Sequence, residues 1–297
     1  MNIRFATVLL VAYTFALNPQ SSMSQKVDED GAQLIEAPFT YSPPTIDGVI
    51  HENEWSGAES NTVDFVDLGV AGNGGSQEID GPDDFSYTFS VMYDDTFLYI
   101  AVDVTDDVYI STNYGQRLQW DMPVTWLNDS VEYFFDGDMN RTIESSRNPT
   151  ESETGGQWIF GAEADDSPLP FVTAELMGGL SRPYGTGADA VWYAQTTADE
   201  TTGNWQQEAR FQLDIIGSPS AGSSIGFNIG LDDADSFDEL TLDEGYYDDN
   251  NRDIQLYWTV FSYSAGEFSQ ESAHEIEELW GTMRFLEPAS IGGWSIY

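Results

Sequence analysis

The chain has no cysteine, a single lysine and only two histidines among its 297 residues. The lack of cysteine excludes a disulfide framework, thiol chemistry and thiolate metal sites. His51 and His274 are too few for a zinc site with three nitrogen ligands, and they leave few axial ligands for haem. The fold must therefore be stabilised by its hydrophobic core, with calcium as the one metal that the abundant carboxylates would suit.

Positive charge is equally scarce. Nine Lys and Arg face 52 Asp and Glu, which gives a formal net charge of −43, and Lys26 is the only lysine. Such a field repels nucleic acid and anionic membranes, so neither is an expected partner. The acidic excess indicates either a saline habitat, where salt screens the repulsion, or simply an acidic secreted protein. With 40% hydrophobic and 14% aromatic residues, the chain can still form a large core.

The N-terminus has the pattern of a secretory signal peptide. A short positive segment ending at Arg4 precedes an apolar run, residues 5–17, that is too short to span a bilayer. Ser22 and Ser24 fit the small residues before a cleavage site, and a retained anchor is the alternative. We therefore expect a secreted protein, extracellular or periplasmic, with the following parts: signal peptide 1–24, flexible leader 25–36, body 37–286 and C-terminal tail 287–297.

Alternating hydrophobicity predicts strands along the body. The side chains from Phe85 to Tyr93 alternate between apolar and polar, a turn follows at residues 94–96, and residues 97–104 return as a second strand of a hairpin. A third strand is expected at 130–136, with Val131, Tyr133 and Phe135 on one face and Glu132 and Phe134 on the other. Further strands are predicted near 157–161, 171–176, 190–196, 205–213, 225–231, 255–261 and 280–286. We predict a single-domain, all-β, antiparallel β-sandwich of the immunoglobulin-like or jelly-roll-like type.

The segment from Trp126 to Asp136 is the most specific one for function. Trp126 stands in a loop just before the predicted strand, and Glu132 follows within it. A sugar ring can stack its C–H face on an indole while its hydroxyls donate to a carboxylate. Trp126 could instead pack in the core, and Glu132 could be an ordinary solvated strand residue. Asp129 is expected to bond its own backbone in a turn that opens the strand.

Two acidic segments are candidate calcium ligands. Asp136, Asp138 and Asn140 alternate as in a calcium loop, but Arg141 and Arg147 replace the glycine and the bidentate glutamate of an EF-hand. The second candidate group is Asp232, Asp233 and Asp235. In both segments a solvated turn is the alternative, and a bound calcium would offset repulsion between the carboxylates.

Five segments in order resemble carbohydrate-binding module family 9. They are Pro44–Gly48 with Glu54-Trp55, Val91–Val102, Asp129–Asp136, Ile225–Ile229 with Asp232-Asp233, and Trp280–Phe285. The resemblance covers residues ~40–286 and implies a β-sandwich that binds sugars, often at chain ends, commonly with structural calcium.

The resemblance also implies site residues. Trp126 matches one of two aromatic side chains that sandwich a sugar ring, Glu132 matches a hydrogen-bonding carboxylate, and Gln157 matches a polar residue of the next strand. Ile159 stands where the family has arginine. The loop 262–279 lacks the family's second tryptophan, so Tyr263 or Phe268 would take that place.

The expected function is therefore non-catalytic binding of a polysaccharide or oligosaccharide. The sequence has no Gly-x-Ser-x-Gly elbow, no Cys–His pair and no phosphate loop, and with 52 acids chance carboxylate pairs carry no weight. The alternatives are an extracellular structural or adhesive module that binds protein and, behind it, a glycoside hydrolase.

Overall fold

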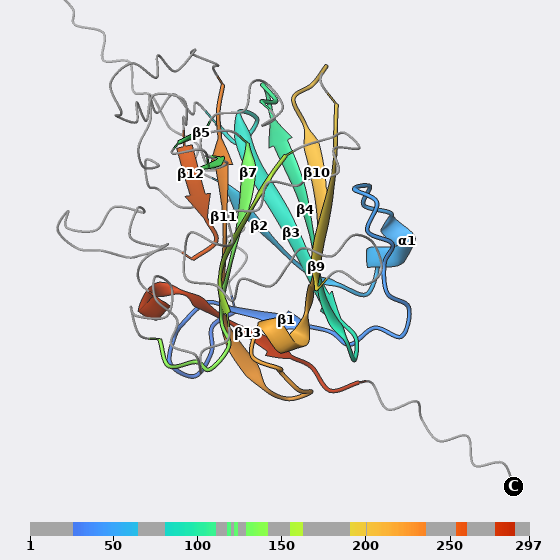
Figure 1. Cartoon of the computed structure of the whole chain (residues 1–297), viewed down its shortest axis with the longest axis vertical. Coiled ribbons are helices and arrows are strands. Elements are labelled where there is room, and N and C mark those ends of the chain that lie inside the picture. The colour runs from blue at the N-terminus through green and yellow to red at the C-terminus, as the bar shows by residue number, and fades with distance from the viewer. Residues whose placement is uncertain are drawn as a thin grey trace, which may run out of the picture.

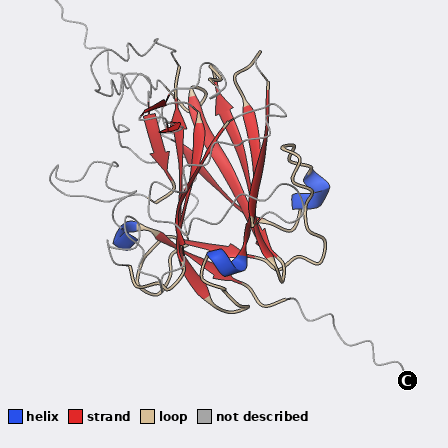
Figure 2. Ribbon diagram, in the orientation of Figure 1, coloured by secondary structure: helices blue, strands red, loops and turns tan. Residues whose placement is uncertain are grey.

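The structure is a computed structural model, and it describes residues 26–64, 81–110, 118–119, 122–123, 129–141, 155–162, 191–199, 201–235, 254–259 and 277–288. Within these ranges strands are the main secondary structure, and they form two layers (Figure 1, Figure 2). The helical pieces are short: α1 (Glu52–Trp55) and the 3₁₀ helices η3 (Leu213–Ile215) and η6 (Glu277–Leu279).

The first layer is a five-stranded antiparallel sheet in the order β2-β3-β4-β10-β9. Its strands are β2 (Glu59–Asp64), β3 (Phe85–Tyr93), β4 (Phe97–Asp106), β10 (Trp205–Gln212) and β9 (Trp192–Ala198). The β3–β4 hairpin pairs Phe85 with Asp106 and Tyr93 with Leu98. Asp94 Oδ1 accepts the backbone N–H groups of Thr96 and Phe97, which closes the turn between these strands.

The second layer is a six-stranded sheet in the order β1-β13-β11-β7-β8, with β12 also paired to β11. Its strands are β1 (Leu34–Ala37), β13 (Gly281–Phe285), β11 (Ser224–Asp233), β7 (Ser130–Asp136), β8 (Gly155–Gly161) and β12 (Ile254–Tyr257). The β1–β13 pair is parallel and the other pairs are antiparallel. A separate two-stranded sheet joins β5 (Leu118–Gln119) and β6 (Met122–Pro123).

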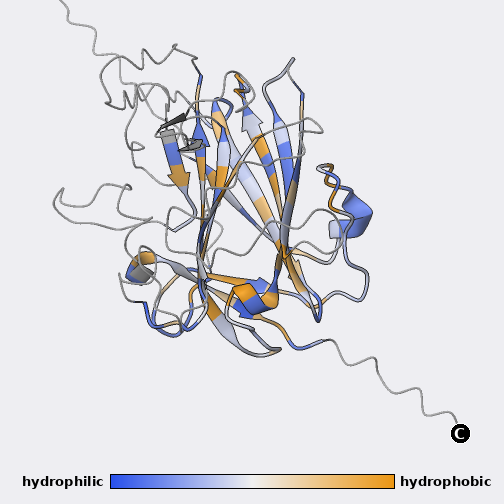
Figure 3. Cartoon of the chain, in the orientation of Figure 1, coloured by the Kyte–Doolittle hydropathy of each residue, from blue (hydrophilic) through white to orange (hydrophobic). Residues whose placement is uncertain are grey.

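The core fills the space between the layers. Side chains of β3 and β4 meet those of β7, β8 and β11, and rings of Phe135, Phe211 and Phe227 pack with centroid distances of 4.9 to 5.6 Å. Hydrophobic residues, shown in orange, recur along the strands of both layers (Figure 3). Each such side chain contributes roughly 1.5–3 kcal/mol by leaving water, so the interface between the sheets is the main source of stability.

The sandwich confirms the predicted fold class. Strand β3 and strand β7 have the predicted bounds, and Val131, Tyr133 and Phe135 lie in the core as expected. The strand expected at 171–176 lies outside the described residues.

Four of the described strands, β1, β2, β5 and β6, were not predicted from the sequence. β2 is an edge strand in which only Val63 is buried, so it lacks an alternating apolar signal. β1 overlaps the expected flexible leader 25–36. That expectation is wrong for the leader's end, because Leu34 and Ile35 are buried and β1 pairs with β13. Among the described residues, no helix has the length and hydrophobicity needed to cross a membrane.

Candidate functional site

The outer face of the six-stranded sheet carries the residues that the sequence singled out. Side chains alternate along β7, so Glu132 and Phe134 lie on the face opposite the core residues. The register aligns Gln157 of β8, Phe134 of β7 and Asn228 of β11 in one row across three strands. We call this row of three residues the polar row, after its two amide side chains, Gln157 and Asn228. The next row aligns Ile159, Glu132 and Gly230.

Aromatic side chains line this face. The ring centroids of Phe134 and Tyr257 are 5.8 Å apart, and those of Phe134 and Trp280 are 5.4 Å apart. The Tyr257 ring lies over Gly230, where an added Cβ would come within 2.5 Å of it. Glycine at position 230 therefore makes room for the tyrosine.

Glu132 is only 2% exposed, and Oε2 accepts a 3.2 Å hydrogen bond from the Tyr257 hydroxyl. The alternative that Glu132 is an ordinary solvated strand residue is therefore wrong. Tyr257 lies 125 residues further along the chain, so no local pattern could have indicated this pair. A sugar hydroxyl that reached Glu132 would share the carboxylate with the phenol.

The polar row contains atoms without hydrogen-bond partners. Gln157 Oε1 and Asn228 Nδ2 are buried and unpartnered, and so is the hydroxyl of nearby Thr259. Asn228 Oδ1 is fully used, because it accepts the N–H groups of Ile229 and Thr259. A buried polar atom without a partner costs ~1–3 kcal/mol, so these atoms, on the two strands that flank β7, are candidates for contact with a polar ligand or water.

The expected aromatic residues Trp126, Tyr263 and Phe268 lie outside the described residues. Of the predicted sugar-binding set, the structure describes Glu132 and Gln157, which occupy adjacent strands on one face. Asn228, Tyr257 and Thr259 complete that face and were not predicted. The alternation of β11 could have found Asn228, since it has the opposite orientation to the core residues Phe227 and Ile229.

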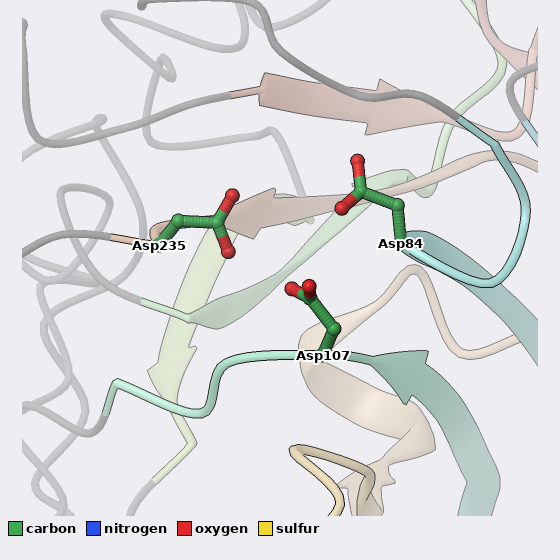
Figure 4. Close-up of side chains that lie close together, drawn as sticks. All are labelled: Asp84, Asp107 and Asp235. Atoms are coloured by element: carbon green, nitrogen blue, oxygen red, sulfur yellow. The ribbon is translucent and has the colours of Figure 1, made fainter.

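Acidic side chains gather where β3 begins and where β4 and β11 end. Two groups of carboxylates have oxygens within 4.8 Å of one another. The first group is Asp84, Asp107 and Asp235, and the second is Asp106, Asp233 and Asp235. Figure 4 shows Asp84, Asp107 and Asp235 pointing toward one another from separate segments. We call the five residues Asp84, Asp106, Asp107, Asp233 and Asp235 the acidic cluster.

Burial dominates the electrostatics of this region. It raises the pKa of Asp106 to about 8, and the charges of Asp235 and Asp107 act in the same direction. Burial also raises the pKa of Asp129 well above its ordinary value, with a further contribution from Asp106. Asp129 accepts the backbone N–H groups of Ile110 and Ala234. Its expected role, bonding its own backbone, is replaced by joining two distant segments.

The structure places the candidate calcium ligands in different surroundings. Asp233 and Asp235 join the acidic cluster, whereas Asp232 accepts a hydrogen bond from the Ser130 hydroxyl at 2.8 Å. In the other segment, Asp138 accepts the backbone and side-chain N–H groups of Asn140, while Asp136 Oδ2 accepts the N–H of Arg141. These oxygens accept hydrogen bonds from within their own turn.

The members Asp84, Asp106 and Asp107 were missed, although the sequence held a signal for them. A hairpin that pairs Tyr93 with Leu98 also pairs Phe85 with Asp106, and therefore places Asp84 beside Asp107. The predicted hairpin, extended in register from its turn to Phe85 and Asp106, brings these acidic residues together.

Comparisons with known proteins agree with this fold. The family model described as "Carbohydrate family 9 binding domain-like" matches residues 46–242, about two thirds of the chain. The chain belongs to this family of non-catalytic carbohydrate-binding modules, and it is therefore not an enzyme. No curated protein matches it.

Two solved structures have the same fold. One is a family 9 carbohydrate-binding module from Caldicellulosiruptor kristjanssonii in complex with cellotriose, with 17% identity, a TM-score of 0.54, and coverage of 89% of this chain and 100% of that chain. The second is a family 9 module from the same organism in complex with glucose, with 18% identity, a TM-score of 0.52, and coverage of 88% and 99%.

Proposed function

We propose that this protein is a secreted carbohydrate-binding protein that holds a neutral saccharide on the outer face of its six-stranded sheet. Trp126 stacks on a sugar ring, while Glu132 and Gln157 contact its hydroxyls. Tyr263 or Phe268 closes the other side. Stacking and two or three hydrogen bonds, each worth ~1 kcal/mol net, give an affinity in the micromolar to millimolar range.

The observation that carries the proposal is the polar row. Gln157 Oε1 and Asn228 Nδ2 are an acceptor and a donor without partners, and they flank the Phe134 ring on adjacent strands. A sugar offers both functions, because each hydroxyl donates and accepts. Phe134, Tyr257 and Trp280 form a buried apolar cluster beside these atoms, so the stacking surface of the proposed site is Trp126.

The test begins with titration of glucose and cellotriose, the sugars in the two similar complexes. Trp126→Ala is expected to abolish measurable binding and to leave the melting temperature nearly unchanged, as measured by calorimetry. A large loss of stability would instead show that Trp126 is a core residue. Binding that survives Trp126→Ala unchanged would exclude the stacking role.

Gln157→Leu provides a sharper variant because stability and affinity should move in opposite directions. The substitution removes a buried oxygen that has no partner, so the free energy of unfolding is expected to hold or rise. The affinity for cellotriose should fall about tenfold, because a hydrogen bond to the sugar is lost. Gln195→Ala, half-buried on the other sheet, is the matched control and should leave binding unchanged.

We also propose that the acidic cluster holds calcium. Its ligands would be carboxylate oxygens of Asp106, Asp233 and Asp235, with Asp84 and Asp107 at the exposed side. Calcium prefers hard oxygen donors. A divalent cation would also offset the repulsion between these closely spaced carboxylates. Calcium here would join the ends of three strands, which is a structural role.

The proposed partner is a neutral polysaccharide or oligosaccharide outside the cell. A net charge of −43 makes nucleic acid and anionic membranes unfavourable partners. Export follows from the signal-like segment 1–24, and N-terminal sequencing of the mature protein from its native host tests it. A start at Gln25 is expected, whereas a start at Met1 would contradict export by cleavage.

A further inference from the structure

A second concave site lies on the opposite side of the sandwich from the polar row. A cavity of about 430 Å³ opens between the segment that follows β1 and helix α1. Helix α1 and strand β12 mark opposite sides of the molecule (Figure 1). A volume of this size is within the range of small-ligand sites.

The cavity combines an apolar floor with polar walls. Met92, Phe39 and two prolines supply the apolar surface. Hydroxyl, amide and carboxylate groups supply the walls: Thr40, Ser42, Asn53, Glu54 and Ser56. Lysine and arginine are missing from this lining, and Glu54 adds a negative charge, so an anionic ligand is disfavoured. A neutral ligand with one apolar face and many hydroxyls matches these walls.

Tyr41 adds an aromatic surface beside the cavity. It lies between the lining residues Thr40 and Ser42, and it is 65% exposed, more than any other large hydrophobic residue of the described ranges. Its ring meets Phe39 edge-on at 4.9 Å, and Phe39 in turn meets Tyr93 at 5.3 Å. The exposed ring therefore packs against Phe39, which Tyr93 contacts in turn.

The walls are fixed by the surrounding structure. The backbone N–H of Thr40 donates to Tyr93, and Tyr93 donates back to Pro38, which ties the segment to the end of β3. The carboxylate of Glu54 accepts the N–H and the hydroxyl of Thr45. A site that is already ordered loses little conformational entropy when a ligand binds.

We infer that this cavity is a second saccharide site, in which Tyr41 stacks on a sugar ring while Asn53 and Glu54 contact its hydroxyls. The choice of a saccharide as ligand class rests on the proposed function, but the two sites share no residue. Because they lie on opposite sides of the sandwich, one molecule could bind two glycan chains at once.

Isothermal titration with cellotriose and with glucose tests the inference through stoichiometry. The unmodified protein should bind two equivalents. Tyr41→Ala and Asn53→Ala should each weaken one of the two by about tenfold, because a stacking contact or a hydroxyl contact is lost. Val49→Ala, an exposed apolar residue outside the cavity, is the control and should keep two equivalents.

The variants separate this inference from the proposed function. A single equivalent that Gln157→Leu weakens and Tyr41→Ala leaves intact would overturn the second site and keep the first. A single equivalent that Tyr41→Ala removes and Gln157→Leu leaves intact would keep the cavity site and overturn the sheet-face site. Absence of binding to both sugars would overturn both. Tyr41→Ala, Asn53→Ala and Val49→Ala should keep the unmodified melting temperature, because these three residues are exposed.

Discussion

The indole Nε1 of Trp55 donates a 2.7 Å hydrogen bond to Oε1 of Glu208, which lies 153 residues later in the chain. Oε2 of the same carboxylate accepts the backbone N–H groups of Asp47 and Gly48. One buried acid on β10 thus anchors helix α1 and the turn before it against the five-stranded sheet. This contact also supports the wall of the cavity beside α1.

We expect Glu208→Ala to be strongly destabilising. The substitution would leave three N–H donors without their acceptor, and each unsatisfied buried group costs roughly 1–3 kcal/mol. The free energy of unfolding should therefore fall by about 3 kcal/mol or more in urea denaturation. Glu52→Ala, an exposed residue of α1 that removes the same charge, should change it by less than about 0.5 kcal/mol. Equal losses in both variants would refute the anchoring role.

The pH dependence of stability should include a contribution from Asp28. Burial raises the pKa of this carboxyl, but hydrogen bonds from the Thr282 hydroxyl and from the N–H groups of Ala32 and Asp30 outweigh it, so the pKa lies below its ordinary value. A lowered folded-state pKa means that the stabilisation is complete above the unfolded pKa and is lost as the pH falls through the folded one.

Asp28→Asn should therefore lower the melting temperature at pH 7, and the difference should shrink as the pH falls below about 3.8. Asp30→Asn, an exposed neighbour, serves as the control and should follow the unmodified protein at every pH. A difference between Asp28→Asn and the unmodified protein that stays constant down to pH 2 would contradict an ionised role for Asp28.

Calcium should stabilise the protein through the acidic cluster. At a free concentration 100 times the dissociation constant, a ligand that binds only the folded state adds about 2.7 kcal/mol. Melting curves with calcium and with a chelator measure this difference. Asp235→Asn should reduce the calcium response and should raise the stability of the chelated protein, because repulsion within the cluster falls.

The control for the calcium experiment is Asp95→Asn, which removes an exposed charge in the β3–β4 turn and should keep the full response. Identical melting temperatures with calcium and with chelator would refute the proposed cation site. A response in Asp235→Asn as large as in the unmodified protein would place the cation elsewhere.

Salt should stabilise the protein through screening. With 52 acidic residues against nine basic ones, the folded chain carries strong self-repulsion. The Debye length falls from about 30 Å at 0.01 M to about 3 Å at 1 M, so the melting temperature should rise steeply at low salt and level off near 1 M. NaCl and KCl should act alike at equal ionic strength. A response that depends on the identity of the salt would point to specific ion binding instead.

Much of the fold was readable from the sequence because its signals are local. The alternation from Phe85 to Tyr93 and the turn at 94–96 defined the first hairpin, and the period of two along 130–136 assigned Val131 and Glu132 to opposite faces. β2 was not predicted because only one of its residues, Val63, is buried, so this edge strand shows no alternation of apolar and polar residues.

The site was harder to predict because its contacts are long-range. Nothing local to Glu132 indicates the phenol of Tyr257, and nothing local to Asp106 indicates that Asp233 and Asp235 join it. These pairings depend on which strands become neighbours in the sheet, and a single sequence does not specify that order. The family resemblance supplied Glu132 and Gln157, which do lie on adjacent strands of one face.

The single lysine has a practical consequence for measuring glycan affinity. Lys26 is bridged to Glu36 and Glu59, and these hydrogen bonds raise its pKa, so less of its amine is free to react at neutral pH. An amine-coupled sensor chip would therefore attach the protein slowly through its only side-chain amine. Coupling in a salt-rich, alkaline buffer would weaken both bridges, and attachment would then be confined to Lys26 and the α-amino group, neither of which belongs to a proposed sugar site.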